Sequence, residues 1–199
     1  MNDAWLFVDI MNQTLSKRSL QPIDVDRYRQ IFDFPIEGYY RELGFDMEEE
    51  SFKDLGSEFI SIYIERMYEP ELYPDTIGII ERLADRGIRH SILSASEQGI
   101  LSKLSQYYGL SDLCVGVRGT DNFYARGKVE MARAMIEELG LLPSEVLVIG
   151  DSTHDHEVAQ ALGSGSVLLS HGHFTRERLE ASGSVVVNNF KELESYITG

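Results

Sequence analysis

Two aspartates that follow a short apolar segment are the residues best suited to chemistry in this sequence. Asp151 and Asp155 come after residues 146–149, whose apolar side chains predict a strand buried on both faces, as in a parallel sheet. In an open α/β sheet, ligands bind outside the carboxyl ends of the strands, where both carboxylates would lie. A pair of acids there suits Mg²⁺, a hard cation with oxygen ligands. Alternatively, Asp151 only ends the strand, and Asp155 begins a helix whose dipole favours an acid.

A hydroxyl and an amine occur at comparable positions earlier in the chain. Ser94 follows a predicted strand at residues 88–93, and Lys128 begins a predicted helix. Both groups can donate to phosphate oxygens, while two carboxylates hold the metal that offsets the phosphate charge. Taken singly, Ser94 is typical of a turn and Lys128 of a charged surface. Their order along the chain, followed by Asp151 and Asp155, favours a phosphate site.

The composition bounds the fold and its partners. The chain has 199 residues, 43% of them apolar, which suffices for one good core and a small second module. A formal net charge of −15 argues against a nucleic-acid partner and means that a phosphate site needs a metal or a local cation. Cys114 is the single cysteine, which excludes an internal disulfide. The apolar run at residues 4–8 is too short for a leader or a membrane span, so we expect a cytoplasmic protein without a membrane partner.

The elements that position these residues follow two patterns. Residues 21–71 carry helical apolar spacing and many aromatic residues, which predict a separate all-helical module with an aromatic core. After Tyr73, short apolar segments alternate with amphipathic helices, the pattern of βαβ units. The predicted fold class is therefore α/β, a Rossmann-like parallel sheet flanked by helices, with a small all-helical module. Further strands are expected at residues 113–117, 167–169 and 185–187, and further helices at residues 75–86, 100–108, 157–162, 176–181 and around Leu193.

The N-terminal segment fits two patterns. Residues 5–9 read as a buried strand that ends in Asp9, the position of a catalytic nucleophile. Apolar residues also recur at helical spacing from Ala4 to Leu15, with Asn2 or Asp3 as a cap. The helix accounts for the spacing of the whole segment, and both alternatives stay open.

From about Tyr73 to the C-terminus the sequence resembles the haloacid dehalogenase (HAD) superfamily of phosphatases, most closely its phosphoglycolate phosphatase-like branch. In that family a Ser or Thr follows the second core strand, as Ser94 does here, and a Lys begins a later helix, as Lys128 does in Gly-Lys-Val-Glu. A strand then ends in Gly-Asp-x-x-x-Asp, which is matched from Gly150 to Asp155. The agreement of three spaced motifs makes the resemblance specific.

The resemblance implies a HAD-like core over residues 73–199, with residues 1–15 either in it or outside it, and a helical cap over residues 16–72. It implies a Mg²⁺-dependent phosphatase that hydrolyses a small phosphorylated metabolite through an aspartyl phosphate. In that scheme Asp151 and Asp155 hold the metal, and Ser94 and Lys128 bind the phosphate. Asp155 and Lys128 are then the catalytic residues, with Asp155 orienting Lys128 or a metal-bound water.

The first motif of the family is where this sequence departs from it. The family places an aspartate nucleophile in a strand end of the form Asp-x-Asp/Asn-Gly-Thr-Leu, and no such string occurs here. Either residues 5–9 are the core strand and Asp9 is the nucleophile, or the segment is the first cap helix and that strand would precede Met1. In the second case we expect low stability, a substitute strand from the N-terminal segment, or pairing with a second copy. The alternative function is then a catalytically impaired or N-terminally truncated homologue that only binds metal and phosphate.

Overall fold

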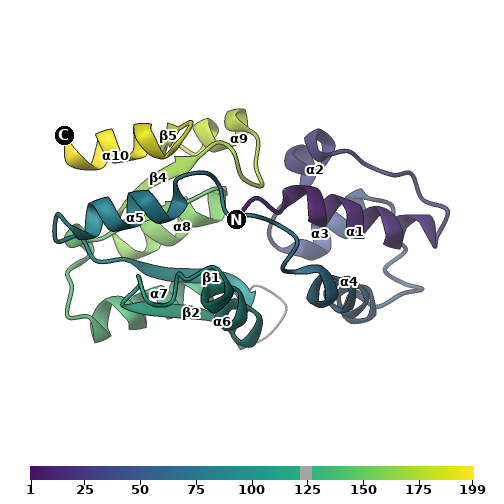
Figure 1. Cartoon of the computed structure of the whole chain (residues 1–199). Coiled ribbons are helices and arrows are strands. Elements are labelled where there is room, and N and C mark those ends of the chain that lie inside the picture. The colour runs from purple at the N-terminus through teal and green to yellow at the C-terminus, as the bar shows by residue number, and fades with distance from the viewer. Residues whose placement is uncertain (122–126) are drawn as a thin grey trace. The chain divides into compact units, whose positions relative to one another are not determined.

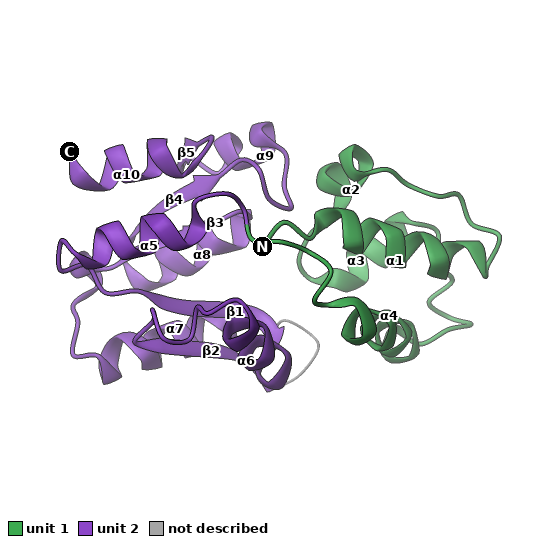
Figure 2. Ribbon diagram, in the orientation of Figure 1, with its two compact units in different colours: residues 1–72 green, residues 73–199 purple. Residues whose placement is uncertain are grey.

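The computed structural model describes residues 1–121 and 127–199 and divides into two units (Figure 1, Figure 2). Unit 1 is Met1–Leu72 and unit 2 is Tyr73–Gly199. The boundary falls where the sequence changes from helical spacing to alternating segments. Residues 1–15, which the sequence allowed either in the α/β core or outside it, lie in unit 1.

Helix α1 decides between the two patterns of the N-terminal segment. It spans Ala4–Ser16, so the helix is confirmed and the alternative strand at residues 5–9 is wrong. Leu6, Ile10 and Leu15 of this helix are fully buried. The Asp9 side chain is 51% exposed and forms an ion pair with Arg66. Asp9 therefore lies on a helix surface and not at the end of a strand.

Aromatic rings fill the core of unit 1, as predicted. Unit 1 continues with α2 (Val25–Ile31), α3 (Ile36–Glu42) and α4 (Phe52–Arg66). Phe7 of α1 contacts the rings of Tyr28, Phe32, Phe59 and Tyr63, with centroid separations of 5.3 to 6.5 Å. These rings come from α1, α2, α4 and the residue after α2, so their packing joins the helices.

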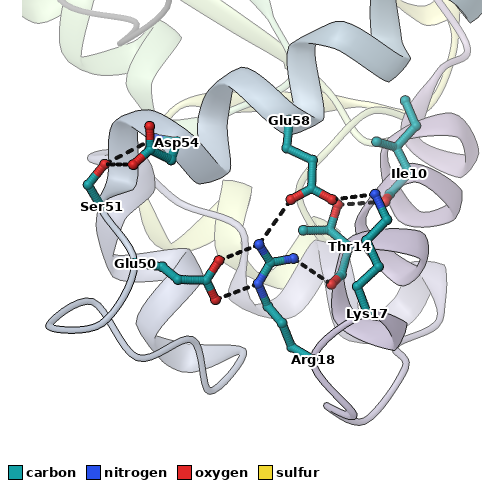
Figure 3. A network of polar contacts seen from close by, with 8 residues as sticks. All are labelled: Ile10, Thr14, Lys17, Arg18, Glu50, Ser51, Asp54 and Glu58. Atoms are coloured by element: carbon teal, nitrogen blue, oxygen red, sulfur yellow. Dashed lines mark hydrogen bonds and ion pairs between the residues drawn. The ribbon is translucent and has the colours of Figure 1, made fainter.

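A polar network lies at the C-terminal end of α1 (Figure 3). The Arg18 guanidinium donates to Glu50 (Nε to Oε1, 2.6 Å), to Glu58 (Nη2 to Oε2, 3.0 Å) and to the carbonyl of Thr14 (2.9 Å). Lys17 Nζ donates to Glu58 Oε1 at 2.6 Å. The network links the end of α1 to α4 and to the loop before it. We assign it a structural role.

Unit 2 alternates strands and helices, and the fold class is as predicted. The elements are α5 (Thr76–Ala84), β1 (Ser91–Glu97), α6 (Gln98–Tyr107), β2 (Gly116–Thr120), α7 (Lys128–Glu138), β3 (Leu147–Gly150), α8 (Thr153–Leu162), β4 (Gly165–Leu169), α9 (Arg176–Ala181), β5 (Val185–Val187) and α10 (Phe190–Thr198). Both β1 and β2 begin three residues later than expected, because their parallel ladder starts with Ser91 opposite Gly116. Apolar pattern alone does not fix that register.

The strands form two parallel sheets among the described residues, where the sequence predicted a single one. One sheet is β1-β2, and the other is β3-β4-β5. In the larger sheet Leu147 lies opposite Gly165, and Val167 lies opposite Val185. Neither sheet pairs with the other, so β1 and β3 are both edge strands.

The inner strand β4 and the edge strand β3 differ in how well their side chains are buried. In β4, Val167, Leu168 and Leu169 are all buried, and a core cluster joins β4 and β5 to α5 and α10. In β3, by contrast, no residue is buried, and Ile149 is 39% exposed. The strand predicted at residues 146–149 is confirmed as β3, but its predicted burial on both faces is wrong, because none of its residues is buried.

Candidate functional site

The Asp155 carboxylate is packed against the end of β3. Asp155 lies in the first turn of α8, which begins at Thr153, earlier than expected. Gly150 makes the packing possible, because a Cβ at that position would lie 2.0 Å from Asp155 Cγ. The glycine of the Gly-Asp-x-x-x-Asp string therefore provides space for the second aspartate.

Both oxygens of Asp155 accept hydrogen bonds. Lys128 Nζ donates to Oδ1 at 2.6 Å. Oδ2 accepts from the backbone amides of Asp151 and Ser152, each at 3.1 Å, and from Ser152 Oγ at 2.8 Å. The Lys128 and Asp155 side chains are only 10% and 8% exposed. Lys128 is therefore not the surface charge that its residue type suggested.

The charge balance keeps Asp155 ionised. Burial raises the pKa of the Asp155 carboxyl, but the Lys128 ammonium and the hydrogen bonds from Ser152 outweigh burial and hold the pKa below its ordinary value. A buried carboxylate that is paired and hydrogen-bonded in this way holds its partner lysine in a fixed place. The pair thus positions Lys128 at the carboxyl end of β3.

Asp151 has a different environment from Asp155. Its side chain lies against the loop after β4, where a Cβ on Gly172 would be 2.2 Å from Asp151 Cβ and 2.0 Å from Oδ2. The preceding residue, His171, is fixed by Tyr73, whose hydroxyl donates to the His171 carbonyl at 2.6 Å. Among the described residues, no hydrogen bond to the Asp151 carboxylate is found.

The two aspartates differ in how well they fit a metal. A carboxylate offers about four lone-pair positions, and Asp155 already accepts four contacts from Lys128, Asp151 and Ser152. Three of these contacts fall on Oδ2 and one on Oδ1, so protein donors use most of the Asp155 lone pairs, and its part as a metal ligand stays a prediction. Asp151 fits a cation that keeps most of its water and takes one or two carboxylates, as Mg²⁺ does. No cluster of three or more His, Cys, Asp or Glu suited to a metal occurs in the described part of the chain.

Ser94 lies in an irregular part of β1. The ladder with β2 shifts between Leu93 and Glu97, so β1 bulges there. Ser94 Oγ accepts from the Ser96 amide at 3.1 Å, and Thr120 Oγ1 donates to the Ser96 carbonyl at 3.3 Å. The hydrogen bonds of the described residues bring Lys128, Asp151 and Asp155 together, and they do not connect Ser94 to this group.

Two site residues were missed at the sequence level. Ser152 stands three residues before Asp155, a spacing typical of a helix cap, so its contact could have been found from that pattern. Gly172 lies between His171 and His173, and its space requirement depends on where Asp151 lies in the fold.

A family model and curated relatives match most of the chain. The model described as haloacid dehalogenase-like hydrolase matches residues 1–169. The phosphoglycolate phosphatase of Rhodospirillum rubrum is 26% identical over 203 residues, which cover 95% of this chain and 83% of that protein. The phosphoglycolate phosphatase of Aliivibrio fischeri is 29% identical over 124 residues, which cover 61% of this chain and 55% of the relative. This chain thus spans about half the length of the second relative.

Solved structures share the fold at low identity. A structure described as a predicted phosphatase from Clostridium acetobutylicum has a TM-score of 0.81 and 17% identity, covering 98% of this chain and 92% of that one. Protein tyrosine kinase A of Mycobacterium tuberculosis also has a TM-score of 0.81, with 18% identity, covering 98% and 91%. These similarities show the fold alone. Among the described helices, none has the length and apolar character needed to cross a membrane, and the cytoplasmic location stays a prediction.

Proposed function

The chain belongs to the haloacid dehalogenase-like hydrolase family, and from this premise we propose that it is a Mg²⁺-dependent phosphatase of a small phosphorylated metabolite. The single observation that carries the proposal is the buried Lys128–Asp155 pair at 2.6 Å, to which Asp151 is joined through its backbone amide, a donor to Asp155 Oδ2. The Lys128 ammonium can bind an anionic phosphate oxygen, and the Asp151 carboxylate can bind the metal cation that accompanies the phosphate. The names of the relatives support phosphoglycolate as the first substrate to test.

Each residue has a proposed part in binding. Asp151 would hold Mg²⁺, which supplies positive charge to the phosphate when bound. Lys128 would donate to a phosphate oxygen, and Asp155 acts as a positioning residue because its own oxygens are occupied. Ser94 would donate to a second phosphate oxygen after its hydroxyl turns away from the Ser96 amide. The acidic chain, with a formal net charge of −15, needs these cations to attract an anion.

The attacking carboxylate implied by the family resemblance is not assigned to Asp9. That residue lies on α1 of unit 1, with its side chain half exposed and paired with Arg66. This observation favours a second candidate function, in which the same residues bind Mg²⁺ and phosphate without turnover. An aspartyl phosphate intermediate remains part of the first proposal only.

Phosphate release and calorimetry together distinguish the two functions. The wild-type chain is assayed with 2-phosphoglycolate and with p-nitrophenyl phosphate in Mg²⁺, and binding of Mg²⁺ and inorganic phosphate is titrated in parallel. Turnover of either ester supports the phosphatase. Binding of inorganic phosphate that requires Mg²⁺, with no turnover, supports the second function. The absence of both turnover and binding in folded protein refutes both.

A further inference from the structure

Tyr73, the first residue of unit 2, contacts the loop that follows β4 in two ways. Its hydroxyl donates to the backbone carbonyl of His171 at 2.6 Å. The Tyr73 and His171 rings are also in contact, with centroids 4.0 Å apart and an angle of 51° between the ring planes. The hydroxyl therefore fixes the backbone of this loop, and the ring fixes the His171 side chain.

Other contacts hold the His171 side chain from the direction of β5 and α10. His171 Nδ1 lies 3.3 Å from the carbonyl oxygen of Asn188, and because a carbonyl only accepts, Nδ1 is the donor. The His171 ring also meets the Phe190 ring edge-on, with centroids 5.6 Å apart. Removal of the Tyr73 hydroxyl alone would thus leave the imidazole ring packed and would release only the backbone carbonyl.

The carbonyl that Tyr73 binds belongs to the peptide group that joins His171 to Gly172. A peptide group is planar, so the His171 carbonyl oxygen and the Gly172 Cα move together as one rigid plane. Gly172 in turn packs against Asp151, because a Cβ on this glycine would lie 2.0 to 2.4 Å from Asp151 Oδ2, Cβ and Cγ. A rotation of this peptide plane would therefore move the surface on which the Asp151 side chain lies.

The two aspartates depend on such packing to different degrees. Asp155 accepts hydrogen bonds from Lys128, Asp151 and Ser152, which fix its carboxylate directly. Among the described residues, no hydrogen bond reaches the Asp151 carboxylate, and its packing against Gly172 limits where it can lie. The place of the Asp151 carboxylate is thus sensitive to the loop after β4.

We propose that Tyr73 is a positioning residue for the metal site. It acts through the His171–Gly172 peptide and the packing of Gly172 on Asp151, and it is not itself a ligand. The inference rests on the proposed function, because it takes Asp151 as the residue that holds Mg²⁺. Tyr73→Phe keeps the ring on His171 and removes the hydroxyl, so this substitution isolates the hydrogen bond.

Calorimetric titration of the full chain with Mg²⁺ alone is the first test. We expect Tyr73→Phe to weaken Mg²⁺ binding by about twofold to tenfold, the range that corresponds to the loss of one neutral hydrogen bond. Tyr196→Phe removes the hydroxyl of a tyrosine on α10 that is 49% exposed, and it should leave the affinity unchanged. Asp151→Asn should abolish the binding, which shows that the titration reports on Asp151.

A second measurement needs no metal and so separates this inference from the proposed function. The ¹³Cγ resonance of Asp151, assigned by its absence from the spectrum of Asp151→Asn, reports on the surroundings of the carboxylate. We expect this resonance to shift or broaden in metal-free Tyr73→Phe and to stay in place in Tyr196→Phe. A merely structural role of Tyr73 would lower the melting temperature and leave both this resonance and the Mg²⁺ affinity of the folded variant unchanged.

Two results would overturn the proposal. One is a Tyr73→Phe variant with the Mg²⁺ affinity of wild type, in a chain whose binding is lost in Asp151→Asn, and the proposed function would survive this result. The other is an unchanged Asp151 resonance in metal-free Tyr73→Phe, which refutes the positioning role whether or not the chain binds Mg²⁺. A folded wild type that binds no Mg²⁺ would refute the proposed metal site, and with it the part of Tyr73 in that site.

Discussion

Replacing Lys128 with methionine removes the cation of the buried pair and keeps most of its apolar stem. Nζ lies 2.6 Å from Asp155 Oδ1, and the two side chains are 10% and 8% exposed, so the pair behaves as buried. Removing one partner of such a pair costs about 3–5 kcal/mol. Asp155 keeps three donors from Asp151 and Ser152, which offset part of the loss. We therefore expect Lys128→Met to lower the free energy of unfolding of unit 2 by about 3 kcal/mol at pH 7.

The loss should depend on pH in a defined direction. In the wild type the pKa of Asp155 is lowered, so the pair stabilises the fold above the ordinary carboxyl pKa and loses this effect as pH falls through the folded pKa. Without Lys128, burial dominates and raises the pKa of Asp155, which then takes up a proton more readily. The difference between variant and wild type should therefore shrink from pH 7 towards about pH 3.

Hydrogen exchange of the β4 amides is the suitable assay, because Trp5 lies in unit 1 and does not report on unit 2. Lys103→Met, which removes an exposed lysine of α6 in the same unit, serves as the control and should change stability little. A loss of equal size at pH 7 and pH 3, or a loss no greater than that of Lys103→Met, would refute the assignment of a buried ion pair.

Two substitutions test other contacts. Gly172→Ala should displace the Asp151 side chain, because the added Cβ would lie 2.2 Å from Asp151 Cβ, and should weaken Mg²⁺ binding measured by calorimetry. The control is Gly38→Ala, where nothing lies within 4 Å of the added Cβ. Equal Mg²⁺ affinity in both variants would contradict the proposed contact. Glu58→Gln should destabilise unit 1 by about 1 kcal/mol at pH 7, as expected for a partly exposed ion pair. Burial raises the pKa of Glu58, but Lys17 and Arg18 outweigh burial, so the pKa is lowered. The stability difference between Glu58→Gln and wild type, measured by Trp5 fluorescence melts, should therefore vanish as pH falls below about 4. A difference that persists there would refute the role of charge.

Local patterns in the sequence predicted the elements around the site. Alternation of apolar segments with amphipathic helices predicted the α/β fold, and helical spacing predicted the helical unit. The start of α7 at Lys128 was expected and is observed. These features depend on residues close together in the chain, so they can be read without the fold.

Features that depend on distant residues could not be predicted in the same way. The ion pair of Asp155 depends on Lys128, 27 positions away. The exposure of Ile149 depends on which elements pack on the faces of β3, and an apolar run looks the same whether one face or both are covered. The space requirement of Gly172 likewise depends on the loop after β4 meeting Asp151.

The Mg²⁺ dependence of phosphate release by wild type and Asp151→Asn tests the central claim most directly. Asp112→Asn, at an exposed carboxylate of unit 2, is the matched control for the removal of one charge. The proposed function predicts that wild type and Asp112→Asn release phosphate from 2-phosphoglycolate in Mg²⁺ but not in EDTA, and that Asp151→Asn loses this activity while remaining folded. A wild-type rate that is unaffected by EDTA, or an Asp151→Asn rate equal to that of wild type, would contradict it.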